Sequence, residues 1–216
     1  MGGTSTQQAD TPSRQIWIWD IPRREATLAA NIDYLASDPA TGSEYLSNGP
    51  VDTSLRPIYR SRNALRRFRE FHSPPIEVTP AVDELWREII LNFVPQDRVQ
   101  FLPIRLIAHG ETCDDYFMLI AFDRVRAVDL EKSEITSKLE KPGITLIYGM
   151  KTVVLKPNGL GGLHLARDEQ SRHLLVSDEL KQALSTTGQD SVFYKPEDII
   201  TLEKLLEGGY PKSGLQ

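Results

Sequence analysis

Two stretches of this chain, QDRVQFLP at residues 96–103 and QDSVFYKP at residues 189–196, share Gln, Asp, Val, an aromatic residue and Pro at identical spacing. Each stretch follows a pattern typical of an amphipathic helix, and a hydroxyl residue stands before each pattern, Thr79 in the first copy and Ser177 in the second. Pro80 suits the first helical position, where its missing N–H is not needed. The repeat therefore predicts two similar units, each made of a capped helix, a turn and a strand that ends at proline.

Each residue of the repeated unit has a structural explanation. The side chains of Thr79 and Ser177 are expected to accept hydrogen bonds from free helix N–H groups, which contributes about 1 kcal/mol apiece. The interval from the cap to the glutamine is 17 residues in the first copy and 12 in the second. The aromatic residues fit a half-buried strand and the prolines fit its end; these positions are Phe101, Tyr194, Pro103 and Pro196. We interpret the repeat as scaffold.

The rest of the chain reads as strands joined by turns. QIWIWDI at residues 15–21 predicts a strand that is covered on both faces. Residues 98–107 and 116–130 flank the turn HGETCDD and predict a hairpin. The polar stretch at 133–143 favours a short helix, and 144–156 supplies one or two strands broken at glycine. Together these patterns predict an α+β fold with a mixed, mostly antiparallel sheet and an N-terminal extension.

Composition divides the chain into four parts. Tails that are expected to be disordered occupy residues 1–14 and 207–216, an extension spans 15–75, and the α+β domain spans 76–206. The contents are those of an ordinary globular protein, with 40% hydrophobic and 25% charged residues. A single cysteine, the lack of a signal peptide at the start and the lack of a long apolar run favour the cytoplasm and no membrane partner.

Charge is unevenly distributed along the chain. The net charge is −5, yet residues 55–71 hold six arginines and one glutamate, a local charge of +5. These arginines, among them Arg56, Arg60, Arg66 and Arg67, can pair with acids of this chain, of a second copy or of another protein. A nucleic-acid partner is not expected, because the pI is near 5.5 and no groove-reading or base-stacking motif is present. Whether this segment is helix or loop stays open.

No stretch of the sequence carries a catalytic or metal-binding pattern. Ser43 lacks the second glycine of a nucleophile elbow, and His109 with Cys113 lacks a second pair to complete a zinc site. The glycine-dense loop at 158–162 matches no phosphate-binding fingerprint, and His164 lies in an apolar strand where a structural role is expected. We expect no enzyme, no cofactor and no metal, with an unrecognised hydrolase as one alternative.

Five motifs in order carry a resemblance to a known family. They are VTPAVDELW at 78–86, VQFLPIRL at 99–106, YFMLIAFDRVRAVD at 116–129, LLVSDELKQAL at 174–184 and VFYKP at 192–196. This pattern resembles the myxococcal-type immunity protein family of bacterial polymorphic toxin systems, over about residues 76–200.

The resemblance implies a non-catalytic cytoplasmic protein that binds and neutralises a cognate toxin. Outside the arginine segment the chain is acidic, which favours a basic toxin such as a nuclease, because complementary charge steers association. The candidate contacts are Glu111, Asp114 and Asp115 in the hairpin loop, and Arg60, Arg66 and Arg67. A homodimeric α+β interaction module unrelated to toxins is the alternative.

Overall fold

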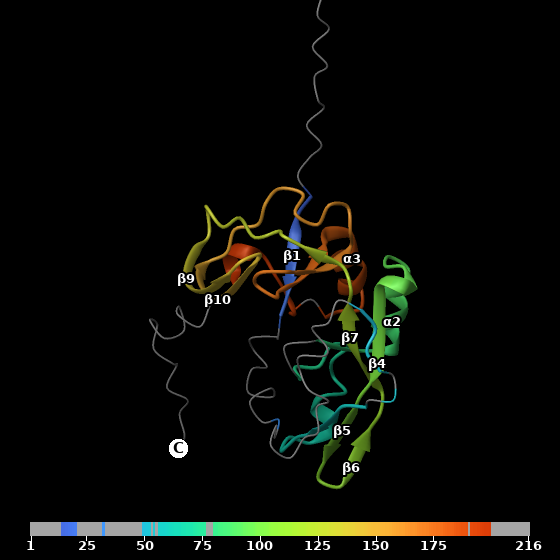
Figure 1. Cartoon of the computed structure of the whole chain (residues 1–216). Coiled ribbons are helices and arrows are strands. Elements are labelled where there is room, and N and C mark those ends of the chain that lie inside the picture. The colour runs from blue at the N-terminus through green and yellow to red at the C-terminus, as the bar shows by residue number, and fades with distance from the viewer. Residues whose placement is uncertain are drawn as a thin grey trace, which may run out of the picture.

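The computed structural model describes residues 14–20, 32, 49–52, 54, 56–76, 80–189 and 191–199, and all structural statements concern these residues. They form an α+β fold, as the sequence predicted, with mostly antiparallel strands that are divided among four sheets. The two α-helices of the described part are α2 (Glu84–Leu91) and α3 (Asp178–Ser185). Both belong to the repeated units and pack against each other (Figure 1).

The largest sheet has five strands in the order β13-β1-β12-β11-β8. Their bounds are β1 (Ile16–Trp19), β8 (Arg124–Val125), β11 (Leu165–Asp168), β12 (Leu174–Ser177) and β13 (Phe193–Tyr194). All neighbours are antiparallel except β8 and β11. The N-terminal strand β1 thus lies inside a sheet built from C-terminal strands. The sequence analysis divided an extension from the α+β domain at residue 75, yet β1 of the extension pairs with β12 and β13 of that domain.

Two three-stranded sheets share one long, bent hairpin. Their strands are β2 (Ile58–Arg60), β3 (Ala81–Asp83), β4 (Val99–Pro103), β5 (Arg105–Ala108), β6 (Glu111–Cys113) and β7 (Tyr116–Ala121), in the orders β3-β7-β4 and β2-β5-β6. The hairpin was predicted, but its turn is only His109 and Gly110, with φ of 51° and 81°. The rest of HGETCDD extends the strand or forms the bend.

The arginine-rich segment is neither one helix nor one loop. It contains strand β2, which runs parallel to β5, and the 3-10 turn η3 (Leu65–Arg67). Further 3-10 turns are η4 (Gln96–Arg98) and η5 (Pro196–Asp198). Figure 1 shows β5 and β6 at the end of the molecule opposite β1 and α3.

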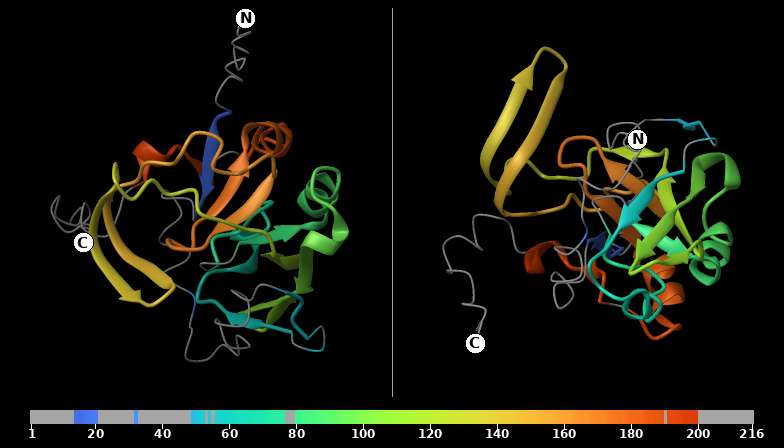
Figure 2. Two further views of the ribbon diagram at one scale, coloured as in Figure 1. Left: turned by 45° about the horizontal axis from the view of Figure 1, so that its top comes forward. Right: turned by 90° about the horizontal axis from the view of Figure 1, so that it is seen from below.

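The prediction of a short helix at residues 133–143 is wrong. These residues form β9 (Glu134–Lys141), which pairs with β10 (Ile144–Thr152) in a two-stranded hairpin. The segment has an apolar residue at positions 135 and 139 of an alternating pattern, and Gly143 supplies a positive φ of 79° for the turn. Figure 2 shows that this hairpin projects from the body of the molecule.

The repeated phrase marks the same substructure built twice. In the first copy β3 leads into α2 and returns as β4, and both strands flank β7. In the second copy β12 leads into α3 and returns as β13, and both strands flank β1. Pro103 ends β4, and Pro196 is the second residue after the end of β13, so both prolines lie where the strands stop. Phe101 and Tyr194 are half-buried, as expected.

The predicted cap of the first helix is wrong, whereas that of the second is confirmed. Helix α2 begins at Glu84 and its N-cap is Asp83, whose Oδ1 accepts a hydrogen bond from Trp86 N at 3.0 Å. Thr79 lies outside the described residues, and Pro80 precedes β3 instead of starting a helix. Pairing of residues 81–83 with β7 buries Val82 completely, so sheet formation delays the helix. The corrected cap-to-glutamine interval is 13 residues, against 12 in the second copy.

The two repeated units meet across an aromatic cluster. Trp86 of α2 stacks on Phe193 of β13 with ring centroids 5.8 Å apart, and Trp19 of β1 meets Trp86 edge-on at 5.4 Å. Leu180 and Leu184 of α3 join this core and are completely buried. The opposite face of the five-stranded sheet packs against the base of the β9–β10 hairpin. Both faces of β1 are therefore covered, as its sequence predicted.

Candidate partner-binding surfaces

The six charged residues that the sequence proposed as contacts gather around the β2-β5-β6 sheet. Arg60 ends β2, and Arg66 and Arg67 lie in η3, which packs against β5 and β6. The acids are the exposed Glu111, which begins β6, and Asp114 and Asp115, which follow it. Segments some 45 residues apart in sequence thus form one charged surface.

Asp114 is engaged inside the molecule. Its carboxylate accepts two hydrogen bonds from Arg105, at 2.8 and 2.9 Å, and forms an ion pair with Arg56 at 2.9 Å. The hydrogen bond from Arg105 is the main reason that the pKa of Asp114 lies below its usual value. Arg56 therefore pairs with an acid of its own chain, one of the alternatives that the sequence left open.

The side chain of Asp115 also has an internal contact, whereas the Glu111 carboxylate forms no hydrogen bond or ion pair with a described residue. The thiol of Cys113 donates to Asp115 Oδ2 at 3.4 Å, and burial raises the pKa of this cysteine. Among the described residues Glu111, Arg66 and Arg67 form no ion pair, and all three are exposed. They are the members of this surface whose charges stay available to a partner.

A second charged surface was not foreseen from the sequence. It is a cleft of about 460 Å³ between the β9–β10 hairpin and the five-stranded sheet. Its charged lining residues are Arg124, Arg126, Lys141, Arg172 and Glu169. We call it the basic cleft, because four cations face one carboxylate in a chain whose net charge is negative.

One of the arginines that line the basic cleft, Arg124, pairs in the sheet with a second arginine, Arg167, which does not line the cleft. Arg124 of β8 and Arg167 of β11 are direct partners in the parallel register, so their side chains leave the same face of the sheet. Arg124 donates from Nη1 to the carbonyls of Ala121 and Asp123, at 2.6 and 3.2 Å. Like charges in directly opposed positions repel each other, so this pair is unusual.

Arg167 is a buried cation without a carboxylate partner. It is 1% exposed, and its Nη1 donates to the carbonyl of Arg172 at 2.7 Å. Its Nε and Nη2 have no hydrogen-bond partner in the described structure. Burial, followed by the charges of Arg124 and Arg172, lowers the pKa of Arg167 to about 10. The carboxylate of the next residue, Asp168, does not pair with the Arg167 guanidinium, because its side chain leaves the other face of the strand.

Asp168 instead holds the turn that presents Arg172. Its Oδ2 accepts from the N–H groups of Ala127 and Val128, and its Oδ1 accepts from those of Gln170 and Ser171. The turn places Arg172 in the left-handed region, with φ of 66°. No described residue pairs with the Arg172 guanidinium.

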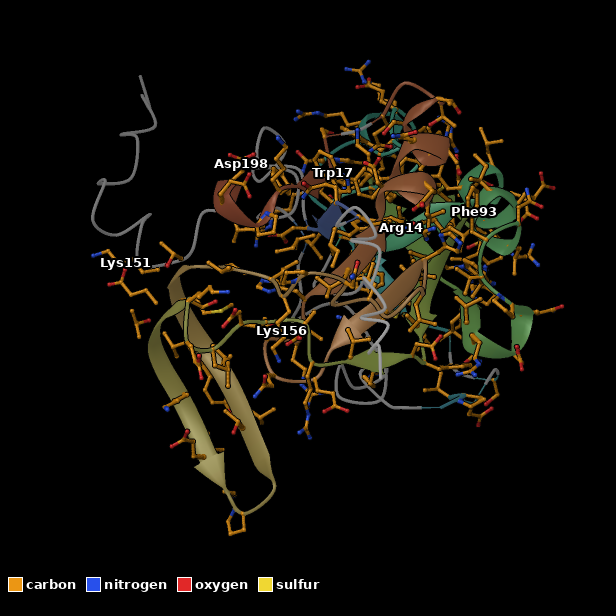
Figure 3. All side chains as sticks on the ribbon, turned by 90° about the horizontal axis from the view of Figure 1, so that it is seen from above. Arg14, Trp17, Phe93, Lys151, Lys156 and Asp198 are labelled. Atoms are coloured by element: carbon orange, nitrogen blue, oxygen red, sulfur yellow. The ribbon has the colours of Figure 1, made fainter. Side chains whose placement is uncertain are left out.

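The remaining charges of the cleft lie further out. Arg126 is exposed and bridges to Glu169 at 2.6 Å. Lys156, which Figure 3 shows between the hairpin and the body, does not line the cleft but donates from Nζ to the carbonyl of Arg126 at 3.0 Å. Lys141 contributes the fourth cation from the end of β9.

The hairpin forms the outer wall of the cleft. Ile147 and Met150 of β10 are buried against the body, and the N–H of Ile147 donates to the carbonyl of Gln170 at 2.9 Å. Tyr148, at a bulge in β10, is 68% exposed, and Leu139 of β9 is 37% exposed. The hairpin is therefore fixed at its base while it presents apolar groups to solvent.

Sequence reasoning missed this cleft because its cations are interleaved with acids and apolar residues. Arg124 and Arg126 occur in DRVRAVD, and Arg167 and Arg172 occur in ARDEQSR, so neither stretch is a basic run. Only the pairing of β8 with β11 brings them together. The arginine alternation in DRVR was the one signal that could have directed attention to it.

The nearest approach to a catalytic arrangement in the described residues is a Ser–His contact. His164 Nδ1 lies 2.8 Å from Ser177 Oγ, beside a cavity of about 370 Å³. However, the same hydroxyl accepts from Leu180 N at 3.2 Å as the cap of α3, and Ser177 is buried. The contact therefore serves the helix terminus, which agrees with the structural role expected for His164.

Two further features concern only the part of the chain that is described. No group of three or more His, Cys, Asp or Glu side chains there has the arrangement of a metal site. No helix there has both the length and the apolar character that crossing a membrane requires.

Comparison with protein families identifies the family of this chain. Residues 50–197 match the model of the immunity protein family (Imm11), and this match covers 148 of the 216 residues. The chain belongs to this family. No curated protein matches the sequence.

The family match confirms the resemblance to immunity proteins and extends it. The sequence motifs placed its start at residue 76, whereas the matched region starts at residue 50. It therefore includes the arginine-rich segment and β2, which the sequence had assigned to a separate extension.

Proposed function

We propose that this protein binds a cognate bacterial toxin in the cytoplasm and neutralises it without catalysing a reaction. The observation that carries the proposal is the match to an immunity protein family over residues 50–197. An immunity protein requires only a complementary surface that blocks its partner, and the two charged surfaces described above can serve this purpose.

The structure supports binding in preference to hydrolysis. Ser177, the hydroxyl nearest to a histidine among the described contacts, is buried and already caps α3. A serine nucleophile has to be free to attack a substrate, and its base has to be oriented by a third group. Turnover of a substrate panel by the purified protein, abolished by Ser177→Ala with the fold retained, would contradict this part of the proposal.

The test is neutralisation of the toxin encoded beside this protein. The toxin domain is expressed in a bacterial host with and without the protein, and survival, co-purification and the mass of the complex are measured. We expect rescue together with a stable complex. A Val82→Asp variant, which places a charge at a completely buried position, is the control and should abolish rescue through loss of the fold.

The surface around the β2-β5-β6 sheet is the first proposed contact. Simultaneous alanine substitution of Glu111, Arg66 and Arg67 removes exposed charges without breaking a described ion pair. We expect weaker toxin binding with unchanged thermal stability. A second variant with alanine at Glu111, Asp114 and Asp115 tests the contribution of the acids apart from that of the arginines. Loss of the Asp114 bridges in this variant is also expected to lower stability. Unchanged affinity in both variants would exclude this surface.

A further inference from the structure

The described residues that line the basic cleft carry more positive than negative charge. Three arginines and one lysine line it, and Glu169 is the only acid among the lining residues. Arg126 bridges to Glu169, and the described lining residues carry four cations against this one carboxylate within a chain of net charge −5. A local positive region on an acidic protein selects for an anionic group at that place and steers it there.

A buried arginine next to one of the lining arginines strengthens this preference. Arg167 sits beside Arg124 in the β8–β11 pair, and its guanidinium has two N–H-bearing nitrogens, Nε and Nη2, without partners. Removing a cation from water without a counter-charge is costly, and an adjacent like charge adds to that cost. A carboxylate that entered beside Arg124 and Arg172 would offset the repulsion among these arginines and Arg167. The electrostatic energy of the cleft is therefore lower when an anion is bound.

The distribution of the cations indicates what kind of anion fits. They come from three places, which are β8 and its continuation, the β11–β12 turn, and the end of β9. Arg126 is exposed and Arg172 is half-buried, so the donors are spread along the cleft instead of converging on one point. Such spacing suits several carboxylates along a chain better than one compact phosphate, which is usually held by converging N–H groups.

The hairpin wall agrees with a peptide occupant. Tyr148 and Leu139 present apolar groups on the element that bounds the cleft. Protein contacts combine such apolar anchors with charged pairs, and exposed tyrosines are enriched in them.

We propose that the basic cleft receives an acidic segment of the toxin, whose carboxylates pair with Arg124, Arg126 and Arg172. This inference rests on the proposed function for the identity of the partner. The predicted acidic contacts around the β2-β5-β6 sheet would then meet a different part of the same toxin.

The first test uses probes that need no toxin. Binding of a fluorescent oligoglutamate peptide is measured by anisotropy, with an oligolysine peptide, inorganic phosphate and a single-stranded oligonucleotide as comparisons. We expect the oligoglutamate to bind and the Arg126→Glu/Arg172→Glu variant to bind it about tenfold more weakly or worse, as loss of charge-assisted contacts requires. Lys181→Glu/Lys195→Glu makes the same change in net charge at two lysines that neither line the cleft nor belong to the proposed toxin contacts, and it should leave peptide binding intact.

The outcomes of the first test are distinguishable. Equal loss in both double variants means that net charge alone drives binding, which overturns the proposal. Tighter binding of phosphate or of the oligonucleotide than of oligoglutamate assigns the cleft to another ligand and also overturns it. Arg126→Gln/Arg172→Gln provides the milder variant if charge reversal perturbs the thermal unfolding curve.

The second test uses the complex with the toxin encoded beside this protein. We expect Arg126→Glu/Arg172→Glu to lose affinity for the toxin, and charge reversal of an acidic toxin segment to restore it. If the wild-type protein binds and neutralises the toxin while the cleft variant does so equally well, the cleft assignment is wrong and the immunity function stands. If the wild-type protein neither binds nor protects, the proposed function fails, whatever the peptide experiment shows.

Discussion

The side-chain amide of Gln189 forms hydrogen bonds with both the backbone N–H and the backbone carbonyl of Ser73, the pair of bonds that a neighbouring strand would form. Its Oε1 accepts from Ser73 N at 3.0 Å and its Nε2 donates to Ser73 O at 3.1 Å, while His72 N donates to the same Oε1 at 2.7 Å. This contact joins the second repeated unit to the chain just before the first. Gln100 holds Val51 in the same manner, with both hydrogen bonds at 2.9 Å.

Replacement of Gln189 by Ala should destabilise the protein, because three backbone groups lose their partners in a buried site. Each unsatisfied buried group costs about 1–3 kcal/mol, so a loss of at least that size in the free energy of unfolding is expected. Gln96 is its counterpart in the repeated phrase and is exposed, so Gln96→Ala is the matched control. The measurement is urea unfolding followed by tryptophan fluorescence. Equal, small effects of both substitutions would show that the Gln189 contact contributes nothing.

The two helix caps should differ in their contributions. Asp83 accepts from Trp86 N and also contacts His72 Nδ1 at 2.6 Å, so Asp83→Ala removes two interactions. Ser177→Ala removes the cap of α3, which is worth about 1 kcal/mol, and the contact with His164. We expect the Asp83 variant to lose more stability, and Asp83→Asn, which can still cap the helix, to recover part of the loss. Chemical denaturation of the three variants decides this ordering.

The repeated phrase allowed the two helix–strand units to be predicted, because helical and strand periodicities are local properties. The exact start of α2 was not predictable in the same way. Residues 78–80 have the composition of a helix start, yet pairing with β7 keeps Ala81–Asp83 extended. The competition between helix start and strand pairing depends on residues more than 30 positions away, and local sequence propensity does not report such distant contacts.

The candidate sites show the same limit more strongly. The charged loop residues were chosen as candidate contacts because they are neighbours in sequence, but the partners of Asp114 come from β5 and from the arginine-rich segment. The basic cleft depends on a parallel pairing between β8 and β11, which are short strands with mixed charge. Contacts of this kind are decided by the tertiary fold, so they could not be predicted from local patterns.

Asp114 should make stability depend on pH at the acidic end. Hydrogen bonds from Arg105 hold the pKa of Asp114 below the ordinary value of 3.8, so its contribution is complete above that value. It is lost as the pH falls from there through the lower pKa of the folded state, because the unfolded chain takes up the proton first. Since the side chain is 41% exposed, solvent and salt weaken the effect. Asp114→Asn should reduce the slope of stability against pH below about pH 4, and the control is Glu111→Gln on the same hairpin. An unchanged slope would contradict the assignment.

Gly159 should not tolerate a side chain, although its backbone conformation would allow one. A Cβ at this position would lie 2.8 Å from Ala127 Cβ and 3.1 Å from the carbonyl oxygen of Lys156. Ala127 is completely buried and cannot move without disturbing the core beneath the loop, so Gly159→Ala should cost about 1–3 kcal/mol. Gly161 is the matched control in the same loop, because it has open space but a positive φ of 61°. Its replacement by Ala should cost about 1 kcal/mol from backbone strain alone. Thermal unfolding of both variants separates steric contact from strain, and a smaller loss at Gly159 than at Gly161 would refute the close approach to Ala127.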